Sequence, residues 1–268
     1  MSVRRLWPAL CLLGCSLGVR AEGAFEVEVE LAGAQALSID LPSTAISVLG
    51  CDVEVPESCP NAVQLSGRWH AIGGTASEAK RTASTPAIEF AADGDWLRMR
   101  AEIPLSVQGL VDLELGEVVL PSSTDVEVVT SLGDVQLRAM TGSVLVDVAV
   151  GDVDVRGPMR STGIHTERGQ VVVVGSGPVD VDLEHGGVRV EQTAGANDVR
   201  INAPRGGVEL LLGSDADVDV RVETPGQIRV QTDAFSAATS GLYRDRSGAG
   251  ASRIEIRAGA DVTIRLAD

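Results

Sequence analysis

Gly133-Asp134-Val135-Gln136-Leu137 and Gly151-Asp152-Val153-Asp154-Val155 are two copies of one short phrase that recurs from Val126 to Thr232. Each copy has a turn residue, often glycine, and then an apolar–polar–apolar triplet. The phrase occurs about eleven times, and such self-similarity decides the fold before any other feature does. The first apolar residues of successive triplets lie 7 to 11 residues apart, which is room for a short strand and a corner. They are Val135, Val144, Val153, Ile164, Val171, Val179, Val188, Val199, Val208, Val218 and Ile228.

The alternation within each triplet predicts a β-strand with one apolar face. Side chains in a strand point alternately to opposite sides, so the flanking apolar residues share one side and the middle residue takes the other. One such strand cannot bury its apolar face alone, whereas stacked copies can. This favours an all-β, single-domain β-solenoid whose units contact mainly their neighbours. The alternative is a β-sandwich or meander, because turn signals every ~8–12 residues mark those folds too. Prolines fall between the triplets, where a missing N–H breaks no ladder; they are Pro158, Pro178, Pro204 and Pro225.

The middle residues predict two outward-facing columns. If two strands make one coil of roughly 18–20 residues, every second copy stacks. One column then contains Gln136, Asp154, Val172, Arg189, Glu209 and Arg229, and the other contains Glu127, Leu145, His165, Asp180, Arg200 and Asp219. The later part of each column alternates in charge, and each pair of opposite charges stabilises a sheet by about 0.2–1 kcal/mol.

These features resemble a family of bacterial putative-adhesin, β-strand-repeat domains of unknown function. Leu120-Pro121 precedes the segment from Asp125 to Val135, serial Gly-x-apolar-x-apolar units follow, and Asp261-Val262-Thr263-Ile264 is similar to the closing strand of the family. The resemblance covers roughly residues 25–268, and its motifs are degenerate. It implies a right-handed β-helix-like fold on the cell envelope, and it transfers no catalytic residue.

Residues 1–21 are typical of a secretion signal. Arg4 and Arg5 precede an apolar run from Leu6 to Val19, and a small-residue cleavage site ends at Ala21. Leu12-Leu13-Gly14-Cys15 also resembles a lipobox, so lipidation at Cys15 is the alternative. No other stretch is predicted to cross a membrane.

The formal charge of −16 excludes one class of partner. Nucleic acid demands a basic surface, so none is expected to bind. Removal of the three signal arginines would make the charge −19. Such acidity favours solubility.

Residues 22–125 are predicted to form N-terminal strands and a cap, residues 126–232 the regular repeats, and residues 233–268 a surface loop and capping strands. Two stretches break the alternation. Ser66 to Pro86 is predicted to be a loop with one helical turn, and Ala234 to Ser252 a long surface loop.

Cys51 and Cys59 are predicted to form a disulfide. They are the only cysteines left after cleavage at Ala21, and a close pair in an exported protein is typical of a structural bridge. A redox-active pair is more often spaced Cys-x-x-Cys, and two thiols alone make a poor zinc site.

Carboxylates spaced two residues apart make calcium the first chemistry to consider. They occur in Gly151-Asp152-Val153-Asp154 and Asp180-Val181-Asp182, but the glycine-rich calcium nonapeptide is absent and calcium needs about six to eight oxygens. Solvated aspartates are the favoured interpretation.

Nucleophilic and glycosidic catalysis find little support. The histidines are His70, His165 and His185, and none lies near a Gly-x-Ser-x-Gly motif. Acid pairs arise by chance in so acidic a chain, and aromatics, common in sugar clefts, are only 3% of residues. We therefore predict no catalytic, cofactor-binding or metal-binding residue, and a protein that is not an enzyme.

The sequence favours a non-catalytic exported β-solenoid that serves as an envelope or surface adhesin or scaffold. One alternative is a polysaccharide-binding or polysaccharide-degrading β-helix protein, which predicts an acidic groove beside Trp69, Trp96 or Tyr243. Another is a periplasmic lipoprotein that senses the envelope through a partner. An envelope or extracellular glycan or protein is the expected partner class, and edge-to-edge pairing of terminal coils remains open.

Overall fold

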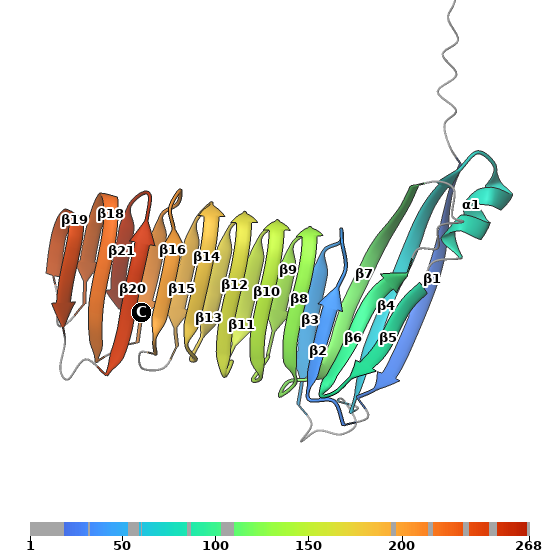
Figure 1. Ribbon diagram of the computed structural model, residues 1–268, viewed down its shortest axis with the longest axis horizontal. Coiled ribbons are helices and arrows are strands. Elements are labelled where there is room, and N and C mark those ends of the chain that lie inside the picture. The colour runs from blue at the N-terminus through green and yellow to red at the C-terminus, as the bar shows by residue number, and fades with distance from the viewer. Residues whose placement is uncertain are drawn as a thin grey trace, which may run out of the picture.

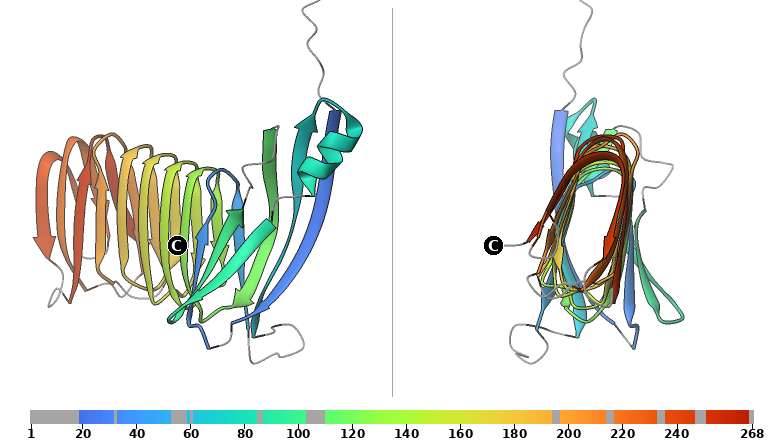
Figure 2. Two further views of the ribbon diagram at one scale, coloured as in Figure 1. Left: turned by 45° about the vertical axis from the view of Figure 1, so that its right-hand side comes forward. Right: turned by 90° about the vertical axis from the view of Figure 1, so that its left-hand side faces the viewer.

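The computed structural model describes residues 19–31, 33–52, 59, 61–84, 87–102, 110–193, 197–213, 217–232, 236–246 and 251–266. These residues form 21 strands in one sheet together with one short helix, so the all-β prediction is confirmed. Seen end-on, the sheet curves around into a flattened, nearly closed tube, barrel-like in cross-section (Figure 2). The strands run across the long axis of this tube rather than along it (Figure 1).

The middle of the tube is built by circuits of two strands each. Each strand pairs in parallel with the second strand after it, as Val126 with Val144 and Val135 with Val153 show. Equivalent corner residues of neighbouring circuits lie 17 or 18 residues apart from Asp134 to Gly187. All of these pairings are parallel, which excludes a meander, where sequential neighbours run antiparallel. The strands are β8 (Asp125–Leu132), β9 (Val135–Arg138), β10 (Ser143–Val150), β11 (Val153–Gly157), β12 (Ser161–Arg168), β13 (Val171–Gly175), β14 (Val179–His185), β15 (Val188–Gln192), β16 (Val199–Ala203) and β17 (Val208–Leu212).

The core fills the inside of the tube with aliphatic side chains from every circuit. Alternation puts Val146, Val155 and Ile201 inside, each almost fully buried. Burial of one such side chain stabilises the fold by about 1.5–3 kcal/mol. The core is therefore one continuous column, and each circuit depends on the circuits on both sides of it.

Glycine occupies one corner of each circuit because the backbones there approach closely. A Cβ on Gly151 would lie 2.0 Å from the carbonyl oxygen of Gly133, and one on Gly169 would lie 1.9 Å from that of Gly151. Gly169 also has a φ of +155°, which side-chain-bearing residues rarely adopt. The residue after the corner glycine forms a hydrogen bond to the next circuit: Asp152 Oδ1 accepts from the backbone N–H of Gln170 at 2.7 Å. The Gly-Asp dipeptide of the repeat is thus a corner that joins one circuit to the next.

The C-terminal end departs from chain order. β18 (Val218–Gln231) is followed by β19 (Ser236–Arg246), which pairs antiparallel with it, and then by β20 (Ser252–Ala258) and β21 (Val262–Leu266). β20 lies between β16 and β18, and β21 lies between β17 and β18. The last two strands are therefore inserted one layer inside the end of the tube (Figure 1). The prediction of a surface loop from Ala234 to Ser252 was wrong over β19, because pairing with β18 outweighs a composition of small residues.

The N-terminal end has a matching insertion. β2 (Ala36–Asp40) lies between β6 (Trp96–Glu102) and β8, and β3 (Ile46–Cys51) lies between β7 (Leu110–Pro121) and β9. The sheet continues antiparallel beyond them, from β7 to β4 (Ala62–Gly73) and β1 (Val19–Glu30), and from β6 to β5 (Ala87–Asp93).

A single helix, α1 (Ala76–Ala83), packs against β1 and β4. Thr75 caps it by accepting the N–H of Glu78. The predicted helical turn is confirmed, but the loop predicted to begin at Ser66 was wrong up to Gly73, which belongs to β4. In the part of the chain that the structure describes, no helix is long and apolar enough to cross a membrane.

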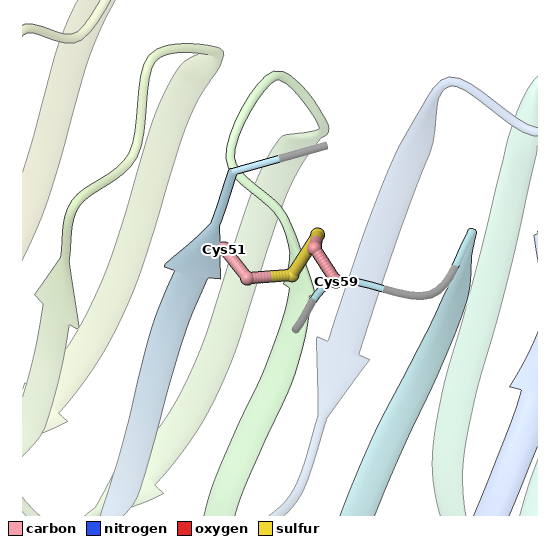
Figure 3. The surroundings of a disulfide bond; sticks show 2 residues. All are labelled: Cys51 and Cys59. Carbon is pink, nitrogen blue, oxygen red and sulfur yellow. A yellow bond between two sulfur atoms is a disulfide. The ribbon is translucent and has the colours of Figure 1, made fainter. Parts of the chain in front are cut away.

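The predicted disulfide between Cys51 and Cys59 is confirmed, with a Cα–Cα distance of 5.3 Å (Figure 3). It joins the end of the inserted strand β3 to the segment that leads into β4. Residues 1–18, including Cys15, lie outside the described residues. β1 begins at Val19, so the predicted cleavage after Ala21 falls within its first residues.

The first predicted column is confirmed over five positions and then breaks. Gln136, Asp154, Val172, Arg189 and Glu209 stack in order. Thr263 of the inserted β21 then separates Glu209 from Arg229, so the expected stack of Arg229 directly on Glu209 was wrong.

The second predicted column was wrong at two positions. Gly163, not His165, lies between Leu145 and Asp180, and His165 belongs to the neighbouring column between Asp147 and Asp182. Above Arg200 comes Glu255 of the inserted β20 in place of Asp219.

Candidate functional site

An open groove of about 610 Å³ crosses the outside of one wall of the tube. It follows the beginnings of the stacked strands β8, β10, β12, β14, β16 and β20, and Trp96 of β6, beyond β2, closes one end. Because stacked strands lie about 4.8 Å apart, a groove across this many layers is elongated along the tube axis. It is suited to a ligand that is itself extended.

The floor of the groove exists because small residues stack in the middle of this wall. Ser143 of β10 is in register with Ser161 of β12, and two residues further along the same strands Leu145 is in register with Gly163. An added Cβ on Gly163 would lie 3.1 Å from the side chain of Leu145. Leu145 remains 49% exposed, so the hollow has an apolar side.

The β8 side of the groove is held by an ion pair. Arg160 Nη2 donates to both carboxylate oxygens of Asp125, Oδ1 at 2.6 Å and Oδ2 at 2.7 Å. Asp125 Oδ1 also accepts a hydrogen bond from the backbone N–H of Ser143. Arg160 Nε donates to Ser143 Oγ at 3.1 Å. The hydroxyl and the carboxylate are therefore oriented by their neighbours before any ligand arrives. Trp96, 36% exposed, lies at the same end.

The other end carries a cation without a close acid. Arg200 is in register with Asp180 on one side and Glu255 on the other. Over the described ranges, no carboxylate lies within 4.0 Å of its guanidinium, whereas Arg253 is 2.5 Å from Glu255. Arg200 is thus available to an anionic or hydrogen-bond-accepting group in the groove.

The three aromatic residues named from the sequence do not converge. Trp69 is 3% exposed and packs against Phe25 in the core, with ring centroids 6.1 Å apart. Tyr243 lies on β19, where burial, then the hydrogen bond and charge of Asp245, raise its pKa to about 12. Trp96 alone lines the groove, so the aromatic support for a sugar cleft is reduced to one residue.

The three histidines lie on separate elements and share no site. His70 on β4 contacts Glu114 at 2.8 Å and Glu22 at 3.6 Å. His165 Nδ1 lies 3.9 Å from Asp182. His185 Nε2 lies 2.6 Å from the Arg205 guanidinium.

Three of the four aspartates considered for calcium have other partners, and the fourth, Asp180, lines the groove. Asp152 accepts the N–H of Gln170, Asp154 binds Arg156 at 2.8 Å, and Asp182 accepts the amide of Asn202 at 2.9 Å. Within the described residues, no group of three or more His, Cys, Asp or Glu side chains is arranged to hold a metal ion.

One acid pair lies outside the groove, on the β5–β6 hairpin. The hydrogen bond to Glu89, followed by the charge of Glu89 and by burial, raises the pKa of Glu102. Glu102 ends β6, whereas Trp96 begins it, so this pair and the groove are at opposite ends of the strand.

No protein-family model and no curated protein matches the chain. Similar solved structures include a putative cell adhesion protein from Clostridium sporogenes ATCC 15579, with 14% identity, 92% of this chain and 100% of that chain covered, and a TM-score of 0.38. A putative adhesin from Bacteroides fragilis NCTC 9343 has 9% identity, covers 91% of this chain and 97% of its own, and has a TM-score of 0.35. A putative adhesin from Parabacteroides merdae ATCC 43184 has 7% identity, with 91% and 96% covered and a TM-score of 0.28. The structural neighbours are thus putative adhesins, the class that the sequence resembles. The proposals below rest on this chain's own geometry.

Proposed function

We propose that the chain is an exported, non-catalytic β-solenoid that acts as a surface or envelope adhesin or scaffold and binds an extended ligand in the groove. The groove is the observation that carries this proposal. It combines an exposed aromatic ring, an exposed leucine, one oriented hydroxyl and one cation without a close acid, which together form a surface for recognition. The disulfide supports export, because such bonds persist in oxidising compartments.

The opposite wall provides a contrast within the same molecule. There Arg189 lies 3.4 Å from Glu209 and 3.7 Å from Glu191, and Arg156 binds Asp154. These charged side chains form ion pairs with one another within the wall, so they offer few unpaired charges to a ligand. A ligand that seeks apolar surface and a cation is therefore favoured at the groove.

Trp96 favours one ligand class, an extended polysaccharide. The face of an indole ring stacks on the C–H face of a sugar, and the hydroxyl of Ser143, the carboxylate of Asp125 and the guanidinium of Arg200 supply hydrogen bonds along the floor. Cleavage of the sugar chain is the runner-up activity, and release of reducing ends from a bound polysaccharide distinguishes it from binding alone.

Binding to alginate, an anionic polysaccharide, and to dextran, a neutral one, tests the groove by surface plasmon resonance. Trp96→Ala, Leu145→Ser and Arg200→Gln should each weaken binding about tenfold, the effect of removing one good contact. Leu132→Ser is the matched control, since Leu132 is 54% exposed but lies outside the groove. Equal losses in Leu145→Ser and Leu132→Ser, or no binding of either polysaccharide, would contradict a glycan groove.

Protease shaving of intact cells, followed by immunoblotting, tests the location. Loss of the chain from intact cells places it on the surface. Protection until the outer membrane is opened excludes adhesion and favours the periplasmic scaffold or lipoprotein. Palmitate labelling that disappears in Cys15→Ser identifies the lipoprotein.

A further inference from the structure

β19 leaves a long, unpaired strand edge at the C-terminal end of the tube. It has 11 residues and pairs with β18, and no other strand of the described ranges pairs with its second edge. An open edge of this kind is a template for pairing with another chain, and proteins commonly protect such edges with charges, proline or a covering element. Residues 236–243 of β19 contain neither proline nor charge, and Leu242 is 54% exposed.

The N-terminal end of the tube does carry such protection. Glu22, Glu26, Glu28 and Glu30 line β1, and α1 packs beside it. The two ends of the tube are therefore different surfaces. The other N-terminal edge strand, β5, has 7 residues and carries Glu89 and Asp93. Among the edge strands that the structure describes, β19 alone combines a long edge with an uncharged stretch.

The shape of β19 is symmetric about Gly241. Residues 236–240 follow one half of β18, residues 241–246 follow the other, and the register shifts between them, at Thr224 and Gln227 of β18. Gly241 has a φ of +84°, which glycine adopts readily. β19 thus arches over the end of the tube, with Ala237 and Tyr243 packed against the core on either side of the bend.

We propose that β19 pairs antiparallel with β19 of a second copy, across a two-fold axis at Gly241, so that two tubes join end to end. A two-fold interface uses the same surface on both copies and closes at a dimer. The continued sheet would then cover the half-buried Ala237 and Tyr243 of both copies.

Charge distribution favours the antiparallel self-pair. In this register Ala238 faces Arg244 of the second copy, Ser236 faces its Arg246, and Ser240 faces its Leu242. Small uncharged residues thus meet the large and charged ones. A parallel pair would instead place Arg244 against Arg244, and like charges directly opposite destabilise a sheet. Both edge strands at the N-terminal end carry acidic side chains, the glutamates of β1 and Glu89 and Asp93 of β5, so a second pairing edge and hence a filament are not expected.

Analytical ultracentrifugation of the purified chain over a range of concentrations tests the proposal. A monomer–dimer equilibrium is expected. Ala238→Lys puts a like charge opposite Arg244 of the second copy at two symmetric positions, and should weaken the dimer about tenfold, whereas Ala238→Glu should strengthen it.

The double variant Ala238→Lys with Arg244→Glu provides the internal control. Within one copy, residue 238 faces Arg229, and this repulsion is the same in the single and the double variant. Recovery of the dimer in the double variant therefore reports the contact between copies. A monomer at every concentration, a filament, or equal responses to Lys and Glu at position 238 would overturn the proposal. Trp96→Ala should leave the dimer unchanged, which separates this interface from the groove.

Discussion

The carboxylate of Asp152 accepts a hydrogen bond of 2.7 Å from the backbone N–H of Gln170, its counterpart in the next circuit. The same bond links Asp134 to the N–H of Asp152 at 2.9 Å, and Gln170 to the N–H of Gly187 at 3.1 Å. A side-chain ladder therefore runs up this corner where the regular strand ladder is interrupted. It explains why a turn residue with a side-chain oxygen follows the corner glycine.

Replacement of Asp152 by alanine should destabilise the fold. The N–H of Gln170 loses its partner, which lowers the free energy of unfolding by about 1–2 kcal/mol at a solvent-accessible corner. Asp152→Asn keeps an acceptor oxygen and should lose much less. Urea unfolding of both variants measures the difference, and equal stabilities would show that water replaces the carboxylate at no cost.

Gly169→Ala should be more damaging than any substitution at an open turn. Its Cβ would meet the carbonyl of Gly151 at 1.9 Å, and its φ of +155° is unfavourable for alanine, so a loss of at least about 2 kcal/mol is expected. Gly94→Ala is the matched control, because Gly94 has a φ of +63° with nothing within 4 Å of an added Cβ. This control should cost only about 1–2 kcal/mol, the left-handed penalty alone. Thermal unfolding of the two variants compares them, and a smaller loss at Gly169 would mean that the corner relaxes.

Reversal of charge at Arg189 should weaken the outer wall opposite the groove. Arg189→Glu places a carboxylate beside Glu209 and Glu191 and should cost about 1 kcal/mol, less at high salt. Arg229→Glu is the control, because Thr263 separates Arg229 from Glu209. The free energies of unfolding of both variants are compared in urea. Equal losses would contradict the separation of Arg229 from Glu209 and would support the stack of these two residues expected from the sequence alone.

Tyr243 is the only tyrosine of the chain, so its phenol can be titrated by ultraviolet absorbance without interference. The folded protein should titrate with a midpoint near 12, raised by burial and by Asp245, against about 10 in the unfolded chain. Because the folded pKa is the higher one, the stability that this group contributes is complete below pH ~10 and is lost as pH rises toward ~12. Asp245→Asn should lower the midpoint. A folded midpoint near 10 would mean that the ring is solvated.

Loss of the disulfide should act mainly through the unfolded chain. Cys51→Ser with Cys59→Ser releases a loop with a sequence separation of 8 and should reduce the free energy of unfolding by about 2–3 kcal/mol in the chain-entropy model. Reduction of the native chain should give the same loss. If neither treatment changes the urea midpoint, the packing of β3 against β7 and β9 already holds this segment.

The sequence predicts the regular part of the fold well because its period is visible residue by residue. The column from Gln136 to Glu209 follows from spacing alone. The error at His165 has a local cause: Thr162 takes an inward position and is 3% exposed, so a search for apolar residues alone assigned the first inward place to Ile164. A buried threonine can thus occupy the first inward position of a strand, and a register assigned from apolar residues alone is then displaced by two residues.

The inserted strands at both ends were beyond sequence reasoning for a different reason. β20 and β21 show the same alternation of apolar and polar residues as the other strands, and this alternation does not indicate which strands they pair with. Long-range pairing is chosen by the edges left open in the folded tube. The position of the groove escaped prediction because its floor is made of Ser143, Ser161 and Gly163, residue types that suggest turns. Of its lining residues, only Trp96 was named in advance as part of a groove.

The inserted strands determine how the molecule responds to a pulling force. In a simple stack, the last strand is held along one edge and can be unzipped one bond at a time. β21 is held along both edges, by β17 and by β18, so tension on it must shear two ladders together. Once β1 is peeled away, β2 presents the same resistance at the other end, between β6 and β8. The sheet itself therefore resists mechanical unfolding from either terminus, and no additional element is needed for this resistance.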